Sequence, residues 1–177
     1  MSIELISVQG LWPLVRRVPW LAAKSASWYF TAERLASLIY VDLFPRHESA
    51  YVDLGPTSTF QLHLQIINLS PFELELEQAN FRFMVEGIQM EKIIVQKQRI
   101  SSGKSISLFL SGDISDGQAK QIAANHKQNA VAHRSNSASL DGNIEFRCGV
   151  RSFAKPILQL SGVQVVVKNE QYRNTKE

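Results

Sequence analysis

The chain reads Thr59-Phe-Gln-Leu-His-Leu-Gln-Ile-Ile67 and continues directly into Asn68-Leu-Ser-Pro71. In the first stretch, apolar side chains alternate with Gln and His, which is the period of a β-strand that buries one face. Pro71 fixes its own φ and has no N–H to donate to a sheet, so the strand should end in a turn. Asn68 and Pro71 are therefore predicted to be structural turn residues.

The period of two continues over most of the chain that follows. A strand at Phe81–Val85 runs to a second predicted structural turn at Gly87. Further short segments of this kind, separated by Gly, Ser and Pro, lie at 73–77, 93–95, 106–110, 144–150 and 158–167. Many short strands joined by such turns are typical of two packed antiparallel sheets. The sequence thus predicts a mainly β fold, an antiparallel two-sheet β-sandwich of fibronectin or immunoglobulin type.

One segment within the predicted sandwich has a helical pattern instead. Ser115 or Asp116 can cap a helix, and small apolar side chains then recur along one stripe. A short inserted helix is therefore predicted over 115–125. The stretch 125–142 is rich in Ser and Asn, and it is predicted to be a long loop.

The first fifty residues hold every tryptophan of the chain and follow a different pattern. From Leu21 to Leu43 apolar side chains recur at helical spacing, and Pro45 should stop the helix. One amphipathic helix is therefore predicted over 20–43. Three roles stay open for it: covering an end of the sandwich, lying in a membrane interface, or docking into a partner's groove. The residues expected to contact a membrane or a partner are Trp12, Arg16, Arg17, Trp20, Lys24, Trp28, Leu35 and Ile39.

The chain is divided into an apolar-aromatic helical segment at 1–48, the sandwich at 49–170 and a polar tail at 171–177. No charge-free apolar stretch reaches the roughly 18–20 residues that a membrane-spanning helix needs. Secretory and twin-arginine signals match the sequence poorly. The expected location is the cytoplasm, at a membrane surface. A mitochondrial location stays open, because residues 1–32 hold three cations and one acid.

Charge and cysteine content narrow the classes of partner. The net charge of +3 is spread along the chain without a basic run, so nucleic acid is not an expected partner. Cys148 is the only cysteine, so no intrachain disulfide can form. Its alternating neighbours predict a small buried thiol, which fits a reducing compartment.

The residues that could perform chemistry do not form a catalytic or metal-binding motif. The four histidines have no cysteine at ligand spacing, and His126 and His133 are expected to be solvated. Glu73, Glu75 and Glu77 share one strand face, where a solvated or edge-protecting strand is favoured over a surface for a cation or a basic partner. The protein is therefore predicted to be no enzyme and to have no cofactor or metal.

The order of these strands and turns carries a resemblance to a known family. The strand Phe60–Ile67 runs into Asn68–Phe72, and 74–76, 81–88 and 100–108 follow, with 144–150 leading to 157–167. In this order the segments resemble the group-2 late-embryogenesis-abundant domain, also called the water-stress-and-hypersensitive-response domain, over residues 50–170. The resemblance implies a fibronectin-like sandwich without catalytic residues, in which the Asn68–Pro71 turn is structural. Members are associated with stress protection, and others are tethered to membranes, where lipid binding or transfer in an apolar groove has been proposed.

Three functions follow from these observations. The first is a non-enzymatic binding or scaffold domain that its N-terminal helix attaches to a membrane or to a larger membrane-associated assembly. The second is the binding or transfer of a lipid or another apolar ligand, and the third is protection during desiccation. The side chains that could line an apolar ligand site are Phe81, Phe83, Leu108, Phe109 and Phe146. The oligomeric state is left open.

Overall fold

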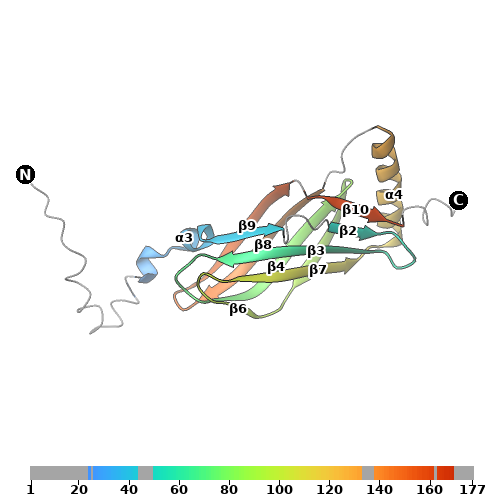
Figure 1. Ribbon diagram of the computed structural model, residues 1–177. Coiled ribbons are helices and arrows are strands. Elements are labelled where there is room, and N and C mark those ends of the chain that lie inside the picture. The colour runs from blue at the N-terminus through green and yellow to red at the C-terminus, as the bar shows by residue number, and fades with distance from the viewer. Residues whose placement is uncertain (1–23, 25, 44–49, 133–137, 162, 170–177) are drawn as a thin grey trace, which may run out of the picture.

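A computed structural model of the protein describes residues 24, 26–43, 50–132, 138–161 and 163–169. These residues form mainly β-strands, arranged in two five-stranded sheets that face each other (Figure 1). Helix α3 (Ala32–Ser37) lies at one end of the sandwich, and helix α4 (Asp116–Val131) lies at the other. The prediction of a mainly β, two-sheet sandwich with small helices is confirmed.

The first sheet is built around β3 (Thr59–Asn68), the strand that contains the alternating stretch. Strand β7 (Ser105–Asp113) pairs antiparallel with one edge of β3. Strands β1 (Ile39–Leu43) and β2 (Ala50–Asp53) pair antiparallel with successive parts of the other edge. Strand β10 (Val165–Lys168) pairs with β2 in parallel, and at this pair the sheet departs from the expected antiparallel arrangement.

The second sheet is entirely antiparallel and is built around β4 (Leu74–Val85). Strand β8 (Ala138–Cys148) pairs with one edge of β4, and β9 (Ser152–Ser161) pairs with the far edge of β8. Strands β5 (Ile88–Ile94) and β6 (Gln98–Ile100) pair with successive parts of the other edge of β4. Strand β4 is therefore central, with neighbours on both sides.

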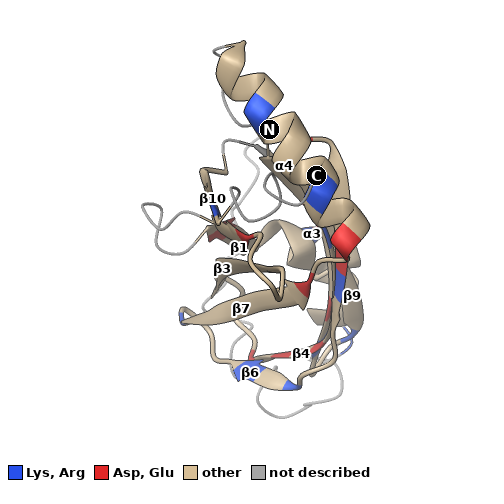
Figure 2. Ribbon diagram, turned by 90° about the vertical axis from the view of Figure 1, so that its right-hand side faces the viewer, with Lys and Arg blue, Asp and Glu red and all other residues tan. Residues whose placement is uncertain are grey.

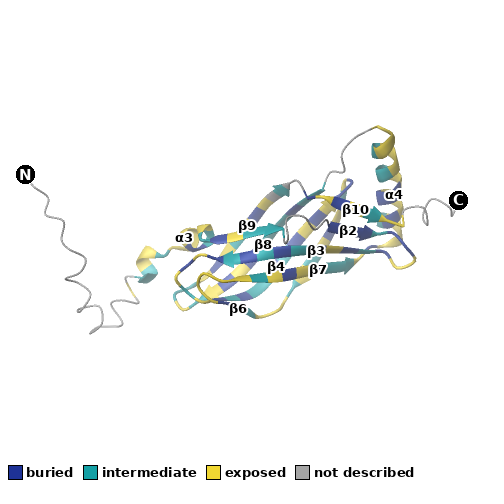
Figure 3. Cartoon of the chain, viewed as in Figure 1, coloured by how far each residue is buried: buried dark blue, intermediate teal, exposed yellow. Residues whose placement is uncertain are grey.

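The core lies between the sheets and is formed by the inward positions of the alternating strands (Figure 3). On β3 the side chains of Phe60, Leu62, Leu64 and Ile66 are all buried, as the alternation predicts. The ring of Phe60 lies 5.8 Å from that of Phe83 on β4, so aromatic side chains of both sheets meet at the centre. Burying a side chain of this size contributes roughly 1.5–3 kcal/mol.

The segment predicted to be one helix over 20–43 has a different structure where it is described. A short helical segment over 26–29 ends before Thr31, whose side chain caps α3 by accepting a backbone hydrogen bond at 3.3 Å. The residues after α3 form β1, because Ile-Tyr-Val is favourable in strands and β3 offers an edge to pair with. The prediction of one continuous helix is wrong. The sandwich also includes β1, which precedes the expected boundary at residue 49.

Helix α4 begins as predicted and continues further than predicted. Ser115 is its N-cap and forms a capping box with Gln118. The helix runs to Val131, so residues 125–131, which were expected in a loop, are helical. The reason lies in the contact that this part of α4 makes with the turn between β4 and β5.

That turn carries a buried carboxylate. Glu86 and Gly87 have φ angles of 50° and 78°, the left-handed conformation of a tight hairpin turn, and this confirms the turn predicted at Gly87. The side chain of Glu86 is buried, and its Oε1 lies 3.3 Å from His126 Nδ1. Asn129 Nδ2 donates to its other oxygen, and Asn125 Nδ2 donates to the Glu86 carbonyl at 2.8 Å. His126, expected to be solvated, is instead part of this contact.

We expect Asn129→Ala to lower the free energy of unfolding by about 1–2 kcal/mol, because the Glu86 carboxylate loses a donor where water does not reach it. Hydrogen exchange should also speed up in α4 more than in β4. Gln128→Ala is the matched control, since Gln128 is the exposed neighbour on the same helix and should change stability by less than about 0.5 kcal/mol. Equal stability of the two variants would contradict this account of how α4 is held.

Candidate functional site

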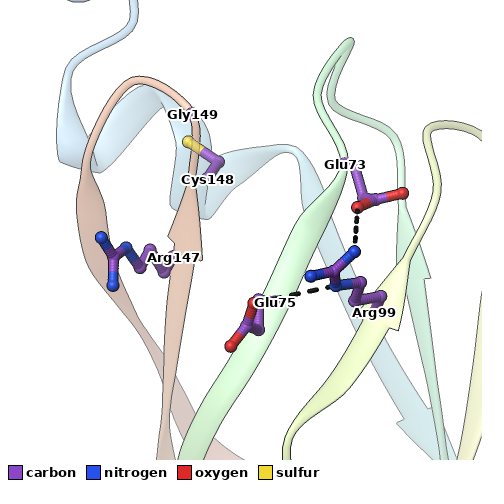
Figure 4. Close-up of a pocket in the computed structure, with 6 residues that line it drawn as sticks. All are labelled: Glu73, Glu75, Arg99, Arg147, Cys148 and Gly149. Atoms are coloured by element: carbon purple, nitrogen blue, oxygen red, sulfur yellow. Dashed lines mark ion pairs between the residues drawn. The ribbon is translucent and has the colours of Figure 1, made fainter.

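An open, charged hollow lies on the outer face of the second sheet. Its volume is about 340 Å³, and it lies over β4, β6 and β8. Figure 4 shows Arg99 between Glu73, which precedes β4, and Glu75 of β4, with Arg147 across the hollow. The lining residues are Glu73, Glu75, Arg99, Arg147, Cys148 and Gly149.

The charges in this hollow are paired with one another. Arg99 lies 3.8 Å from a carboxylate oxygen of Glu73 and 3.8 Å from one of Glu75. Glu75 also lies 3.6 Å from Lys97 Nζ, and Glu77 lies 4.0 Å from Arg147. Cross-strand cations therefore neutralise these acids. Of the two favoured alternatives, an edge-protecting strand is wrong because β4 is central, whereas a solvated face agrees with the partly exposed side chains of the three acids.

Cys148 is the only thiol near this hollow, and its hydrogen bond serves the local turn. Its Sγ donates to the carbonyl oxygen of Arg151 at 3.3 Å, and its backbone N–H donates to the same oxygen at 3.0 Å. It is half-buried rather than fully buried as predicted. Among the residues that the structure describes, no three His, Cys, Asp or Glu side chains could hold a metal ion together.

A second hollow of about 380 Å³ lies on the first sheet, around Asp53 and Lys168. Hydrogen bonds from the Asn169 amide and then from the Gly55 N–H hold the pKa of Asp53 below its ordinary value. Lys168 Nζ lies 4.1 Å from the centre of the Tyr51 ring. These contacts tie the end of β10 to β2, and they form no arrangement with catalytic geometry.

The N-terminal aromatic residues form a different kind of surface. Trp28 is 86% exposed and Tyr29 is 57% exposed, and both lie on the short helical segment over 26–29. Lys24 is exposed close by in the sequence. The other members of the expected contact set at the start of the chain lie outside the described residues: Trp12, Arg16, Arg17 and Trp20.

This aromatic pair is held against the sandwich by its neighbours. Phe30 packs edge-on against Phe72, with ring centroids 4.9 Å apart, and against Tyr29 at 5.0 Å. Arg34 lies 4.5 Å from the centre of the Tyr29 ring and donates to the Tyr29 carbonyl at 3.0 Å. The guanidinium of Arg151 donates to the carbonyl of Ser27, 124 positions earlier in the chain.

Sequence reasoning did not single out these supporting residues. Phe30 and Tyr29 stand in the aromatic segment, but nothing local shows which aromatic side chain turns inward. Arg151 follows a strand far along the chain, so only the folded structure brings it to Ser27.

Two members of the expected contact set are inside the protein. Leu35 and Ile39 are 0% and 1% exposed, and both belong to the core cluster. Leu35 points inward from α3, which packs against β9, and Ile39 is an inward position of β1. The expectation that they contact a membrane or a partner is therefore corrected.

The residues expected to line an apolar ligand site separate into two groups. Phe81, Phe83, Leu108 and Phe146 are buried in the continuous core. Phe109 is 49% exposed on the outer face of β7, so it cannot line an internal space with them. A surface hollow of about 450 Å³ does touch Phe81, but its other walls are largely polar or charged.

The predicted turn after β3 is confirmed as a structural element. Asn68 is fully buried, and its amide nitrogen donates to the carbonyls of Phe72 and Ile100 at 2.7 and 2.9 Å. Its amide oxygen accepts from the N–H and the hydroxyl of Ser70 at 2.9 and 2.6 Å. All four hydrogen bonds of the Asn68 amide are made to Ser70, Phe72 and Ile100 of the same chain, so the role of this side chain is structural.

Among the helices that the structure describes, none combines the length and the apolar character that crossing a membrane would require. No family model matches the chain, and no curated protein matches its sequence.

Solved structures do match the fold. The Arabidopsis thaliana protein AT1g01470 matches with a TM-score of 0.50 at 13% identity, covering 73% of this chain and 81% of that one. The structural-genomics target SoR45 matches with a TM-score of 0.50 at 11% identity, covering 72% and 87%. A candidate late embryogenesis abundant protein, At2g46140.1, matches over 97% of both chains at 10% identity, with a TM-score of 0.49. At such identities the two matches at 0.50 show a shared β-sandwich fold and nothing about activity.

Proposed function

We propose that this protein is a non-catalytic binding domain that attaches to an anionic membrane surface through the aromatic and cationic residues of its N-terminal segment. The observation that carries the proposal is the exposure of Trp28 and Tyr29 on a segment that Phe30 and Arg151 hold to the sandwich. Moving a large exposed aromatic side chain from water into a headgroup region lowers the free energy. There its ring is buried and its polar atom stays hydrated.

Cations near the aromatic pair support the same function. Arg34 is exposed and stacks on Tyr29, and Lys24, four positions before Trp28, is also exposed. Basic side chains beside an aromatic surface are attracted to anionic lipid, with roughly 1 kcal/mol for each cation near the surface. In sequence the segment continues this pattern with Trp12, Trp20 and the pair at Arg16 and Arg17. The location proposed is accordingly the cytoplasmic side of a membrane.

The test uses point variants of the full chain, because truncation into α3 or β1 would remove core side chains. The full chain should float with vesicles of phosphatidylcholine and phosphatidylserine, and added salt should weaken the binding. The double variant Trp28→Ala/Tyr29→Ala should bind at least about tenfold more weakly, since burying one large apolar side chain is worth roughly 1.5–3 kcal/mol and about 1.4 kcal/mol corresponds to a factor of ten.

The matched control is Leu158→Ala/Val131→Ala, which shortens two side chains that are 84% and 77% exposed elsewhere on the protein. It should float like the unaltered chain. If the full chain does not float with these vesicles, or if both double variants bind equally well, the proposal of membrane attachment fails.

The two other functions expected from the sequence stay predictions. Desiccation protection rests on the family resemblance, and binding of an apolar ligand would need space among side chains that fill the core. Neither has an observation of its own that favours it over the exposed aromatic pair.

A further inference from the structure

Strand β7 has one edge that pairs with no strand among the described residues. Its nine residues pair with β3 over their whole length, from Thr59↔Asp113 to Ile67↔Ser105. The other edge of β7 presents backbone donors and acceptors that a further strand could use.

The pairing with β3 shows which residues carry these outward backbone groups. Asn68 N–H donates to the carbonyl of Lys104 at 2.9 Å, and Ile114 N–H donates to the carbonyl of Ser58 at 2.8 Å. Lys104 and Ile114 flank β7 in the same register, and both are even-numbered residues that bond toward β3. In an antiparallel pair, hydrogen-bonded positions alternate with positions that are not hydrogen-bonded. The even-numbered residues of β7 therefore bond to β3. The N–H and C=O groups that point away from β3 belong to Ser105, Ser107, Phe109, Ser111 and Asp113.

The sequence of β7 lacks the features that usually protect an edge strand. From Ser105 to Gly112 it contains no charged residue and no proline (Figure 2). The other strands with an outer edge each contain such a feature: Asp42 in β1, Glu91 and Lys92 in β5, Arg99 in β6, Lys155 and Pro156 in β9, and Lys168 in β10. Charges and prolines at an edge oppose pairing with another chain. Of the described edges, β7 is thus the one best suited to pairing.

The outward side chains of β7 suit pairing with an identical strand. Ser107 and Ser111 are small and uncharged, and they flank Phe109 symmetrically. Phe109 is 49% exposed and lies against His63, with ring centroids 4.7 Å apart. Antiparallel pairing of two copies about Phe109 would set the two Phe109 rings opposite each other and Ser107 opposite Ser111. No like charges then meet, and the outward backbone groups of both strands are in register.

We propose that β7 is a pairing edge for a second copy of this chain, so that two sandwiches join antiparallel along Ser105–Asp113 about a two-fold axis at Phe109. The sheet that contains β7 in one copy then continues into the same sheet of the second copy. A closed pair of this kind buries the edge that would otherwise be open to further association.

Sedimentation equilibrium of the full chain, without lipid, tests the proposal. Strand-edge contacts are small interfaces, so the measurement should extend to roughly 500 µM protein. The mass should rise from 19.9 kDa toward twice that value with concentration. Phe109→Lys places two like charges opposite each other and should weaken the association at least tenfold. Leu158→Lys, an equal change at an exposed position of β9, should not weaken it.

Cysteine variants test the register and do not depend on the effect of Phe109→Lys on folding. A hydrogen-bonded antiparallel pair has its Cα atoms about 5.5 Å apart, within the disulfide range. Under mild oxidation Phe109→Cys should give a covalent dimer, and the unaltered chain, which has only Cys148, should not. Ser107→Cys and Ser111→Cys should each stay monomeric alone and cross-link when mixed.

The proposal is overturned if the full chain keeps the monomer mass at all concentrations, if Phe109→Lys associates as strongly as Leu158→Lys, or if Phe109→Cys does not cross-link. Because these measurements contain no lipid, they succeed or fail separately from the proposed membrane attachment.

Discussion

Replacing Asn68 by alanine is expected to lower the free energy of unfolding by about 3 kcal/mol, and the melting temperature by roughly 6–12 °C for a chain of this size. The side chain is fully buried, so the groups it binds cannot turn to water instead. Without the amide, the carbonyl of Ile100 loses the donor at 2.9 Å, and Ser70 loses the acceptor of its N–H and hydroxyl. Denaturant unfolding followed by circular dichroism measures the change.

Leu69→Ala is the matched control for Asn68→Ala. Leu69 is the next residue of the same turn and is 61% exposed, so its truncation should change stability by less than about 0.5 kcal/mol. A second variant, Asn68→Asp, keeps the shape but replaces the donor by a carboxylate oxygen that faces two carbonyls. That contact favours the protonated carboxyl, so its pKa in the folded state should lie above the unfolded value of about 3.9. The stability of Asn68→Asp relative to the unaltered chain should therefore fall as pH rises through the folded-state pKa. Equal stability of Asn68→Ala and Leu69→Ala would contradict the role assigned to the turn.

The parts of this fold that could be predicted from the sequence are those set by local pattern. Alternation in Phe60–Ile67 identifies a half-buried strand, because successive side chains of a strand point to opposite faces. The turn at Asn68–Pro71 is equally local, since Pro71 restricts the backbone and Asn68 accepts from Ser70 two residues on. What the sequence did not show is that the same Asn68 amide also donates to Ile100, which lies on β6 of the other sheet.

The error at the N-terminus has a physical reason in the spacing of the residues. Leu35 and Ile39 are four apart, which fits one face of a helix. They are also buried in the structure, but Leu35 points inward from α3 and Ile39 from β1. A change from helix to strand between two inward residues leaves the apolar spacing unchanged, so periodicity alone cannot detect it. The edge of β3 that makes Ile39–Leu43 a strand is supplied by a distant part of the chain.

The other contacts that the sequence did not predict involve polar residues whose partners lie far away along the chain. Glu86 stands in a hairpin turn, where a glutamate is ordinarily solvated, and it is buried because α4 covers it. Arg151 joins the β8–β9 turn to Ser27 in the same way. These contacts are what position α4 and the exposed pair Trp28 and Tyr29 at opposite ends of the sandwich. The candidate surfaces thus depend on contacts between segments that sequence order does not bring together.

Gly142 is expected to tolerate no side chain, although it stands in the middle of a strand. It lies on β8 opposite Phe81 of β4, next to a shift of register in the pairing with β9. A Cβ atom at this position would lie 2.6 Å from the backbone carbonyl oxygen of Asn80 and 2.9 Å from the Phe81 ring. Strand β8 is paired on both edges, so the backbone has little freedom to withdraw. We expect Gly142→Ala to lower the free energy of unfolding by about 2–3 kcal/mol and Gly142→Val by more, measured by denaturant unfolding.

The sign of this effect distinguishes close packing from the general behaviour of glycine. In an extended or helical backbone, replacing glycine by alanine ordinarily stabilises a protein by about 0.4–1 kcal/mol, because the unfolded chain loses freedom. Gly117 in the first turn of α4 has open space where its Cβ would be, so Gly117→Ala should be neutral or stabilising. Both substitutions add the same methyl group, and only the one at Gly142 meets the backbone of a central strand. Equal stability of Gly142→Ala and Gly117→Ala would contradict this account. It would mean that β4 and β8 do not approach each other as closely as the contact between Gly142 and Asn80 requires. The core between Phe81 and Ile144 would then be packed differently.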